Sequence, residues 1–124
     1  MNKEFVNYEQ ALALKELGFD ETCLKWYMHS NNLSDDVIFL QYKKDDEFCY
    51  APLKQQVFRW FREKHDLFGC IDLQACSPSH WFIRIDKIEI NDYLYHSEDE
   101  NVKYNTYEEA EDACIDKLIE KLIN

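Results

Sequence analysis

The sequence predicts an α+β fold, a single domain in which three helices pack on a mainly antiparallel sheet. Apolar residues recur at helical spacing in three segments that also carry helix start and stop signals. The segments between them are rich in β-branched and aromatic residues and are interrupted by turn formers. The expected order is therefore helix, strands, helix, β-meander, helix. The 124 residues contain no repeat or linker that would divide them, so one domain over residues 1–124 is expected.

The first helix is expected over residues 6–19. Asn7 can cap its N-terminus, with Gln10 at the third helical position to return the bond as in a capping box. Gly18 can end the helix, and Phe19 is then placed to fold back in a Schellman motif. Start and stop signals agree on the same segment.

The second helix is expected over residues 51–65, with Pro52 in its first turn, where a missing N–H has no partner to lose. One apolar face follows the spacing of a buried stripe and consists of Leu53, Val57, Trp60 and Phe61. The third helix is expected over residues 106–124, where Thr106 and Glu109 can form a capping box.

Strands are expected over residues 23–28 and 37–42 on either side of a polar turn at 31–36. A hairpin joins 68–74 to 80–90, and 91–96 and 101–105 add one or two further strands around an acidic turn. Within 80–90, Ile88 and Ile90 are out of phase with the preceding apolar residues. A bulge near Asp86 and Lys87 would return them to the buried face.

The composition is acidic, with 25 acids against 14 bases and a net charge of −11. This balance repels phosphate backbones and disfavours nonspecific binding to nucleic acid or anionic lipid. No apolar run is long enough to span a bilayer, and the N-terminus lacks the pattern of a secretory signal, so no membrane contact and a cytoplasmic location are expected. The five widely spaced cysteines are expected to be reduced.

The motifs of common catalytic and cofactor sites are missing. Only two glycines occur, far apart, which excludes the usual nucleotide-binding loops, and the acidic turns lack the ligand spacing of a calcium loop. No cofactor is therefore expected, and the protein is not expected to be an enzyme. A small enzyme that uses a cysteine and a histidine remains as an alternative.

A weak zinc candidate combines three side chains around the first hairpin turn, namely Cys70, Cys76 and His80. Thiolate and imidazole are the ligands that zinc prefers, and a turn can bring them together. The spacing is not that of structural zinc sites, and free cysteines are usually buried without a ligand. We therefore expect that these residues bind no metal.

The second helix carries a basic and aromatic segment in this acidic chain. Its candidate interaction residues are Lys54, Phe58, Arg59 and Arg62. If Phe58 is exposed, the segment can stack on a base or contact an acidic peptide. If Phe58 is buried, the patch loses its stacking element and the arginines simply face water.

Three segments together, YEQALALKELGF at 8–19, APLKQQVFRWFREK at 51–64 and TYEEAEDACIDKLIE at 106–120, resemble a widespread group of small uncharacterised bacterial proteins. These relatives often occur in a phage or mobile-element setting. The resemblance implies a phage-associated accessory role and assigns no functional residues.

The leading expectation is a non-enzymatic cytoplasmic module that acts through protein–protein contact, with a protein partner or as a homo-oligomer. The acidic turns at 35–36, 45–47 and 98–100 offer a surface for a basic partner. The alternative is a nucleic-acid-associated phage protein that uses the basic helix around 54–64.

Overall fold

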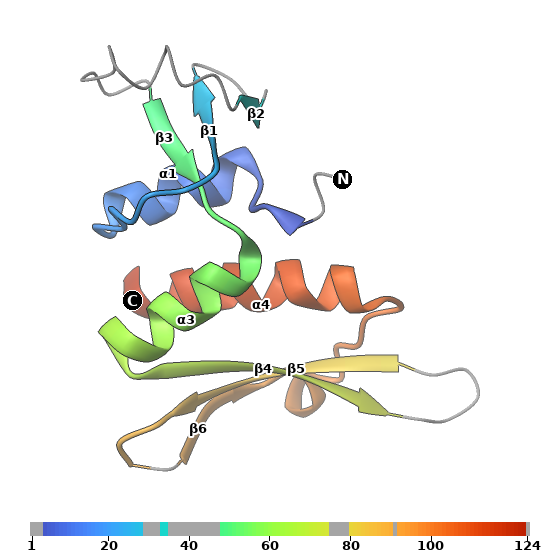
Figure 1. Ribbon diagram of the computed structural model, residues 1–124. Helices are drawn as coiled ribbons and strands as arrows, with labels where there is room; N and C mark the ends of the chain where they lie inside the picture. Colours follow the sequence, from blue (N-terminus) through green and yellow to red (C-terminus); the bar gives the residue numbers. More distant parts are fainter. Residues whose placement is uncertain (1–3, 29–32, 35–47, 75–79, 91, 124) are drawn as a thin grey trace. The chain divides into compact units, whose positions relative to one another are not determined.

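The computed structural model describes residues 4–28, 33–34, 48–74, 80–90 and 92–123. The chain divides into two compact units, residues 1–54 and 55–124, and each is described here by itself. The predicted α+β class and the order helix, strands, helix, meander, helix are confirmed (Figure 1). The strands form two separate antiparallel sheets, and the prediction of a single domain stays a prediction.

The first unit combines helix α1 (Tyr8–Glu16) with a three-stranded antiparallel sheet in the order β2-β1-β3. The strands are β1 (Lys25–Met28), β2 (Leu33–Ser34) and β3 (Phe48–Ala51). In the centre of the sheet, Trp26 of β1 lies opposite Tyr50 of β3. Helix α1 contacts β3.

Both end signals of α1 are confirmed. The Asn7 side chain accepts a hydrogen bond from the Gln10 backbone N–H at 2.7 Å, and the Gln10 side chain accepts one from the Asn7 N–H at 3.0 Å. At the other end, the Phe19 N–H donates to the Leu14 carbonyl at 2.9 Å. Gly18 has a φ of +97°, the left-handed conformation that a Schellman motif requires.

The second predicted helix begins later than expected. Helix α3 spans Lys54–His65, so Pro52 precedes the helix instead of lying in its first turn. The Pro52 carbonyl accepts from the Val6 N–H at 3.1 Å, and Leu53 pairs with Phe5 in an isolated bridge. A proline disfavours the helical conformation of the residue before it, and Ala51 accordingly ends strand β3.

The strand predictions for the first unit are met only in part. The segment predicted at 23–28 contains β1, but the polar turn predicted at 31–36 contains strand β2. Strand β3 was not predicted. The strand expected at 37–42 lies outside the described residues.

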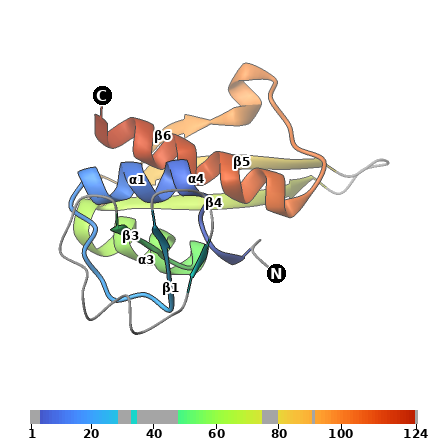
Figure 2. The same ribbon diagram turned by 90° about the horizontal axis from the view of Figure 1, so that it is seen from above.

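The second unit contains the meander β4 (Leu67–Gln74), β5 (His80–Lys87) and β6 (Asp92–His96), in that order across an antiparallel sheet. Helix α4 (Tyr107–Ile123) runs along one face of this sheet, and α3 lies on the same side (Figures 1 and 2). The buried apolar side chains of α4 are Ala110, Cys114, Ile115, Leu118 and Ile119.

The start of α4 carries half of the predicted capping box. The Glu109 N–H donates to the Thr106 hydroxyl oxygen at 3.1 Å, as predicted. The Glu109 carboxylate accepts from the Asn105 N–H at 3.2 Å, one residue before the position that a complete box would use. None of the described helices is long and apolar enough to cross a membrane.

The end of the β5–β6 hairpin departs from the prediction. The pairing register shifts between Ile85 and Asp86, close to the predicted bulge. Strand β5 nevertheless ends at Lys87, and Ile88 and Ile90 are 45% and 63% exposed in the turn that follows. The prediction that the bulge returns both isoleucines to the core is wrong, because the chain leaves the sheet before it reaches them.

The last strand prediction, at 101–105, is reduced to a single bridge between Tyr104 and Trp81. Before it, the acidic turn forms a short 3₁₀ helix, η2 (Ser97–Glu100). Ser97 is fully buried, and its hydroxyl accepts a hydrogen bond from the Ile83 N–H at 3.0 Å. This contact ties the turn to the central strand.

Candidate functional site

The candidate residues on α3 divide into two buried and two exposed side chains. Phe58 is only 5% exposed and Lys54 only 4% exposed, so neither is available to stack on a base or to bind a phosphate. Arg59 and Arg62 are exposed. Of the two alternatives left open for Phe58, burial is the one observed, so the basic helix loses its stacking element, and the predicted interaction residue Lys54 is buried as well.

Phe58 is buried because β4 approaches α3 closely at a glycine. A Cβ atom on Gly69 would lie 2.9 Å from the Phe58 ring and 3.0 Å from both the Cys114 sulfur and a Leu118 methyl group. The ring therefore fills space that a side chain at position 69 would take. Helical periodicity placed Phe58 beside the buried stripe, but could not show that a strand covers this side of the helix as well.

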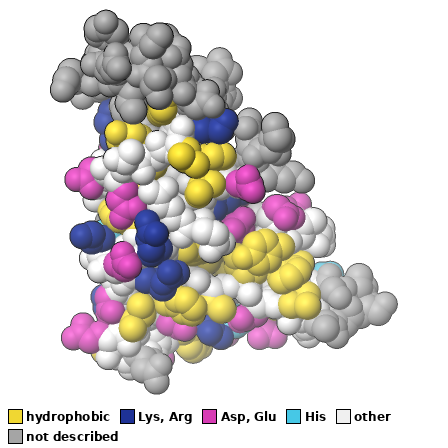
Figure 3. Space-filling model, viewed as in Figure 1, with side chains coloured by type: hydrophobic (Ala, Val, Ile, Leu, Met, Phe, Trp, Pro, Cys, Tyr) yellow, Lys and Arg dark blue, Asp and Glu magenta, His cyan; other side chains and the backbone are white. Residues whose placement is uncertain are grey.

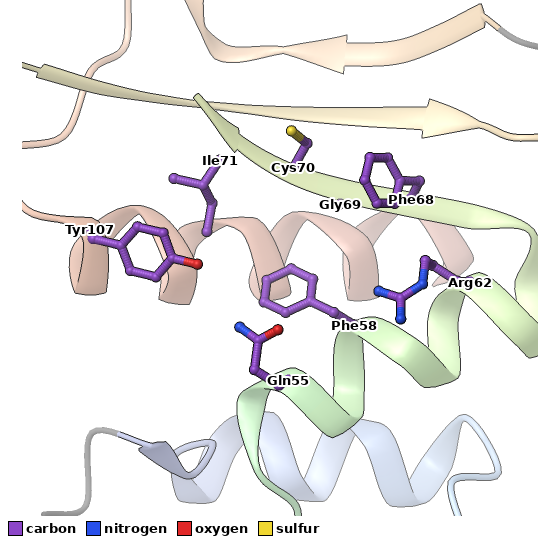
Figure 4. A pocket seen from close by; sticks show the side chains of 8 residues that line it. All are labelled: Gln55, Phe58, Arg62, Phe68, Gly69, Cys70, Ile71 and Tyr107. Carbon is purple, nitrogen blue, oxygen red and sulfur yellow. The ribbon is translucent and has the colours of Figure 1, made fainter. Parts of the chain in front are cut away.

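A pocket of about 210 Å³ opens beside Phe58, between α3, the start of α4 and β4 (Figure 4). Its apolar wall consists of Phe58 and Ile71, and strand β4 borders it from Phe68 to Ile71. Figure 4 shows Ile71 pointing toward the helices, whereas the Cys70 side chain points away from them. Gln55 and Tyr107 lie toward one end of the pocket and Arg62 toward the other.

The Gln55 and Tyr107 end of the pocket is held by hydrogen bonds. The Gln55 side-chain N–H donates to the Glu111 carboxylate at 3.1 Å, and Gln55 also hydrogen-bonds the Tyr107 hydroxyl. Glu111 is buried at 8% exposure. Burial, followed by the Glu111 charge, raises the pKa of Tyr107, so its hydroxyl stays protonated at neutral pH. This end of the pocket is polar, fixed and next to a negative charge.

The other end of the pocket carries an exposed cation. Within the part of the chain that the structure describes, Arg62 makes no hydrogen bond or ion pair. Residues 55–65 carry three bases, Arg59, Arg62 and Lys64, against Glu63, a local charge of +2 in a chain of −11. Figure 3 shows Lys and Arg side chains gathered over α3, with hydrophobic side chains beside them toward the start of α4.

A second surface lies at the far end of the β5–β6 hairpin. Four large apolar residues within seven positions are exposed by 45% to 63%, and we call them the hairpin end: Ile88, Ile90, Tyr93 and Leu94. A pocket of about 300 Å³, lined by Phe68, Asp86, Lys87 and Ile88, adjoins it. Residues 86–100 around it carry six acids and one lysine, a local charge of −5.

The orientation of the hairpin end is set by Asp66, the residue between α3 and β4. Asp66 has a left-handed backbone with φ of +61°. Its carbonyl accepts from the Ile88 N–H at 3.1 Å, and its carboxylate accepts from the Glu89 N–H at 2.9 Å. The Lys87 ammonium lies 3.8 Å from the same carboxylate. One residue thus contacts three consecutive positions, the last residue of β5 and the first two residues of the turn.

The sheet face turned away from the helices carries a charged cluster around Asp72. The Arg84 guanidinium lies 3.4 Å from Asp72 and 3.2 Å from Asp86. The Cys70 thiol donates to Asp72 at 3.3 Å, and His96 Nε2 lies 3.8 Å from the other Asp72 oxygen. Asp72 therefore lies between the thiol and the imidazole.

This arrangement does not activate Cys70 as a nucleophile. Burial, followed by the hydrogen bond to Asp72 and its charge, raises the pKa of the thiol, while Arg84 partly opposes this. A reactive cysteine needs the opposite shift and a neighbouring base. Among the other described cysteines, Cys114 has a pKa raised to about 12 by burial. Neither thiol has the electrostatic surroundings that the cysteine enzyme alternative requires.

The weak zinc candidate is not assembled by the hairpin. Cys70 pairs with Arg84 and His80 pairs with Gln74, so the two candidate ligands are four pairs apart along the sheet. That separation is roughly 14 Å at the usual rise per residue, whereas two zinc bonds together span about 4 Å. Cys76 lies outside the described residues. Within the described ranges, no three His, Cys, Asp or Glu side chains gather as a metal site would need.

No protein-family model, curated protein or solved structure matches the chain. The candidate surfaces are therefore defined by the geometry of the chain alone. Sequence reasoning found Arg62 but missed Gln55, Tyr107 and the hairpin end. The signal for the hairpin end was present, because Ile88 and Ile90 are out of phase with the core side of β5.

Proposed function

We propose that the protein is a non-enzymatic interaction module that binds a protein partner through the hairpin end. The observation that supports this most is the exposure, by 45% to 63%, of Ile88, Ile90, Tyr93 and Leu94 in one short hairpin segment. Single exposed apolar residues are ordinary on protein surfaces, but contiguous groups mark interaction sites. Covering a half-exposed aliphatic side chain contributes about 1 kcal/mol, so a partner gains several by covering all four.

The charge around the hairpin end indicates what kind of partner fits. Because residues 86–100 have a net charge of −5, two copies of this surface would repel each other face to face. A partner segment with apolar side chains flanked by lysine or arginine matches both the exposed apolar side chains and the negative charge of the hairpin end. Its association would be accelerated by charge and would slow as salt is added.

The nucleic-acid alternative receives less support from the same geometry. Of its four predicted residues, only Arg59 and Arg62 are exposed, and Phe58 is buried under β4. Two arginines on a chain with a net charge of −11 give few phosphate contacts.

The resemblance of the sequence to phage-associated bacterial proteins extends the proposal of a protein-interaction module to an accessory protein that acts in the bacterial cytoplasm.

The proposal can be tested with a fluorescent peptide of alternating leucine and lysine, read by anisotropy at low and physiological salt. Replacement of Ile90 and Leu94 by serine should weaken binding by about tenfold or more, because it removes roughly 1 kcal/mol of apolar contact at each position. Leu24→Ser is the matched control, since Leu24 is 72% exposed and lies outside the hairpin. It should leave binding unchanged.

A second peptide, with serine in place of each leucine, separates charge from apolar contact. Its binding should be weak and insensitive to the hairpin substitutions. Equal binding of the wild type and the Ile90 and Leu94 double variant would refute the assignment of the hairpin end. Sedimentation velocity on the free protein adds a check, because self-association abolished by the same double variant would replace the basic partner with a second copy.

A further inference from the structure

We propose that the pocket between α3, β4 and the start of α4 binds a small apolar group that carries a carboxylate. The pocket is separate from the hairpin end, so the proposal does not depend on the function proposed above. Its three structural elements are an apolar wall, a cation at one end and a fixed polar group with a buried negative charge at the other (Figure 4).

The size and the wall of the pocket select a small apolar group. Its volume of about 210 Å³ is below the usual range of sites for nucleotides or cofactors, about 300 to 1,000 Å³. Phe58 and Ile71 supply contact surface without hydrogen-bonding side chains. A branched aliphatic chain or a single ring fits this wall and gains by leaving water.

The cation at the rim selects the charge of the ligand. Arg62 lines the pocket, is exposed, and makes no hydrogen bond or ion pair with the described residues. A guanidinium presents parallel N–H donors that match the two oxygens of a carboxylate. Some other described cations in this unit are already engaged, as Arg84 is with Asp72 and Asp86, and Lys117 is with Glu120. Arg62 is therefore available to an outside anion.

The opposite end fixes the direction in which the ligand lies. Glu111 is buried and its carboxylate already accepts from Gln55, so an anion placed there would meet a like charge in a poorly solvated site. Gln55 and the Tyr107 hydroxyl can still face a neutral polar group. A ligand consequently binds with its carboxylate at Arg62 and its apolar body along Phe58 and Ile71.

The test uses 4-methylpentanoate, its neutral analogue 4-methylpentanamide, and N-acetylleucine as a mimic of a peptide C-terminus, added to ¹⁵N-labelled protein. The reporter is the backbone amide of Gly69, which lines the pocket and is one of only two glycines in the chain. Both acids should shift this resonance in the millimolar range. The amide should bind about fivefold more weakly, the value of one well-placed but exposed ion pair.

Two matched variants separate the contribution of the ion pair with Arg62 from the effect of removing any exposed arginine on α3. Arg62→Gln should weaken both acids about fivefold and leave the amide unchanged, whereas Arg59→Gln should change neither. If N-acetylleucine binds more tightly than 4-methylpentanoate, the natural source is a peptide C-terminus, and the reverse order indicates a free carboxylic acid. Equal binding of acid and amide, unchanged binding to Arg62→Gln, or no shift at Gly69 would each overturn the proposal.

Discussion

The edge of the Phe58 ring lies 2.9 Å from the point that a Cβ atom on Gly69 would occupy. Gly69 is in the middle of β4, where glycine is ordinarily unfavourable because it has no side chain to pack. Here the missing side chain lets an aromatic ring of α3 and the side chains of α4 reach the strand. One glycine therefore decides both the burial of Phe58 and the floor of the pocket beside it.

Gly69→Ala should destabilise the protein by about 1 to 3 kcal/mol, the usual cost of forcing an extra group into a packed core. Urea unfolding followed by tryptophan fluorescence measures the change. Combining it with Phe58→Leu should recover part of the loss, since the smaller side chain relieves the closest contact. Additive effects of the two substitutions would show that the ring and the strand are not in contact.

Ile85 and Ile88 provide a matched pair within one hairpin. Ile85 is fully buried and Ile88 is 45% exposed. Ile85→Val should lower the free energy of unfolding by about 0.5 to 1.5 kcal/mol, and Ile88→Val should change it by less than about 0.5 kcal/mol. Equal losses at the two positions would place Ile88 in the core, as the sequence predicted, and would remove it from the hairpin end.

The reactivity of Cys70 should respond in opposite directions to its two charged neighbours. Asp72 raises the pKa of the thiol and Arg84 lowers it, on top of the larger effect of burial. Asp72→Asn should therefore speed alkylation of Cys70 by iodoacetamide at pH 8, and Arg84→Gln should slow it. Mass spectrometry of the Cys70 peptide gives both alkylation rates. If both substitutions changed the rate in the same direction, the opposing effects of Asp72 and Arg84 on the Cys70 thiol would be contradicted. Cys114, with its pKa raised to about 12, should stay unmodified in the folded protein.

His65 should make stability depend on pH in the acid range. Its imidazole lies 4.6 Å from the Trp60 ring, and burial together with the Lys87 charge lowers its pKa. The unfolded chain, with an ordinary histidine pKa of about 6.5, then binds the proton more tightly. The stabilisation is present above that pKa and is lost as pH falls through the lower folded value. His65→Gln should reduce the dependence of the unfolding free energy on pH. An NMR titration that gives His65 a pKa at or above 6.5 would refute this explanation.

The parts of the fold that could be predicted are those written in local sequence. Asn7 with Gln10, and Gly18 with Phe19, define both ends of α1, and all four act as expected. The start of α3 was misplaced because Pro52 suits a first helical turn as well as the extended segment that pairs with Val6. That choice depends on a contact 46 positions away in the chain, which periodicity does not reveal.

In the candidate site, too, local features could be predicted from the sequence and long-range contacts could not. The exposure of Arg59 and Arg62 follows from helical spacing, and the structure agrees with it. The burial of Phe58 depends on Gly69 and on α4, and the link from Gln55 to Glu111 joins residues 56 positions apart. Such long-range contacts build the pocket. Local pattern therefore identifies single candidate residues but not the cavity that they surround.

The three consecutive contacts that Asp66 makes with Lys87, Ile88 and Glu89 have a consequence for recognition. Because these contacts hold the turn in place before any partner binds, the turn has less conformational entropy to lose on binding. If the hairpin end binds a partner as proposed, its affinity depends in part on a residue that the partner does not need to contact. Asp66 is a place where binding strength could be tuned without changing the contact surface itself.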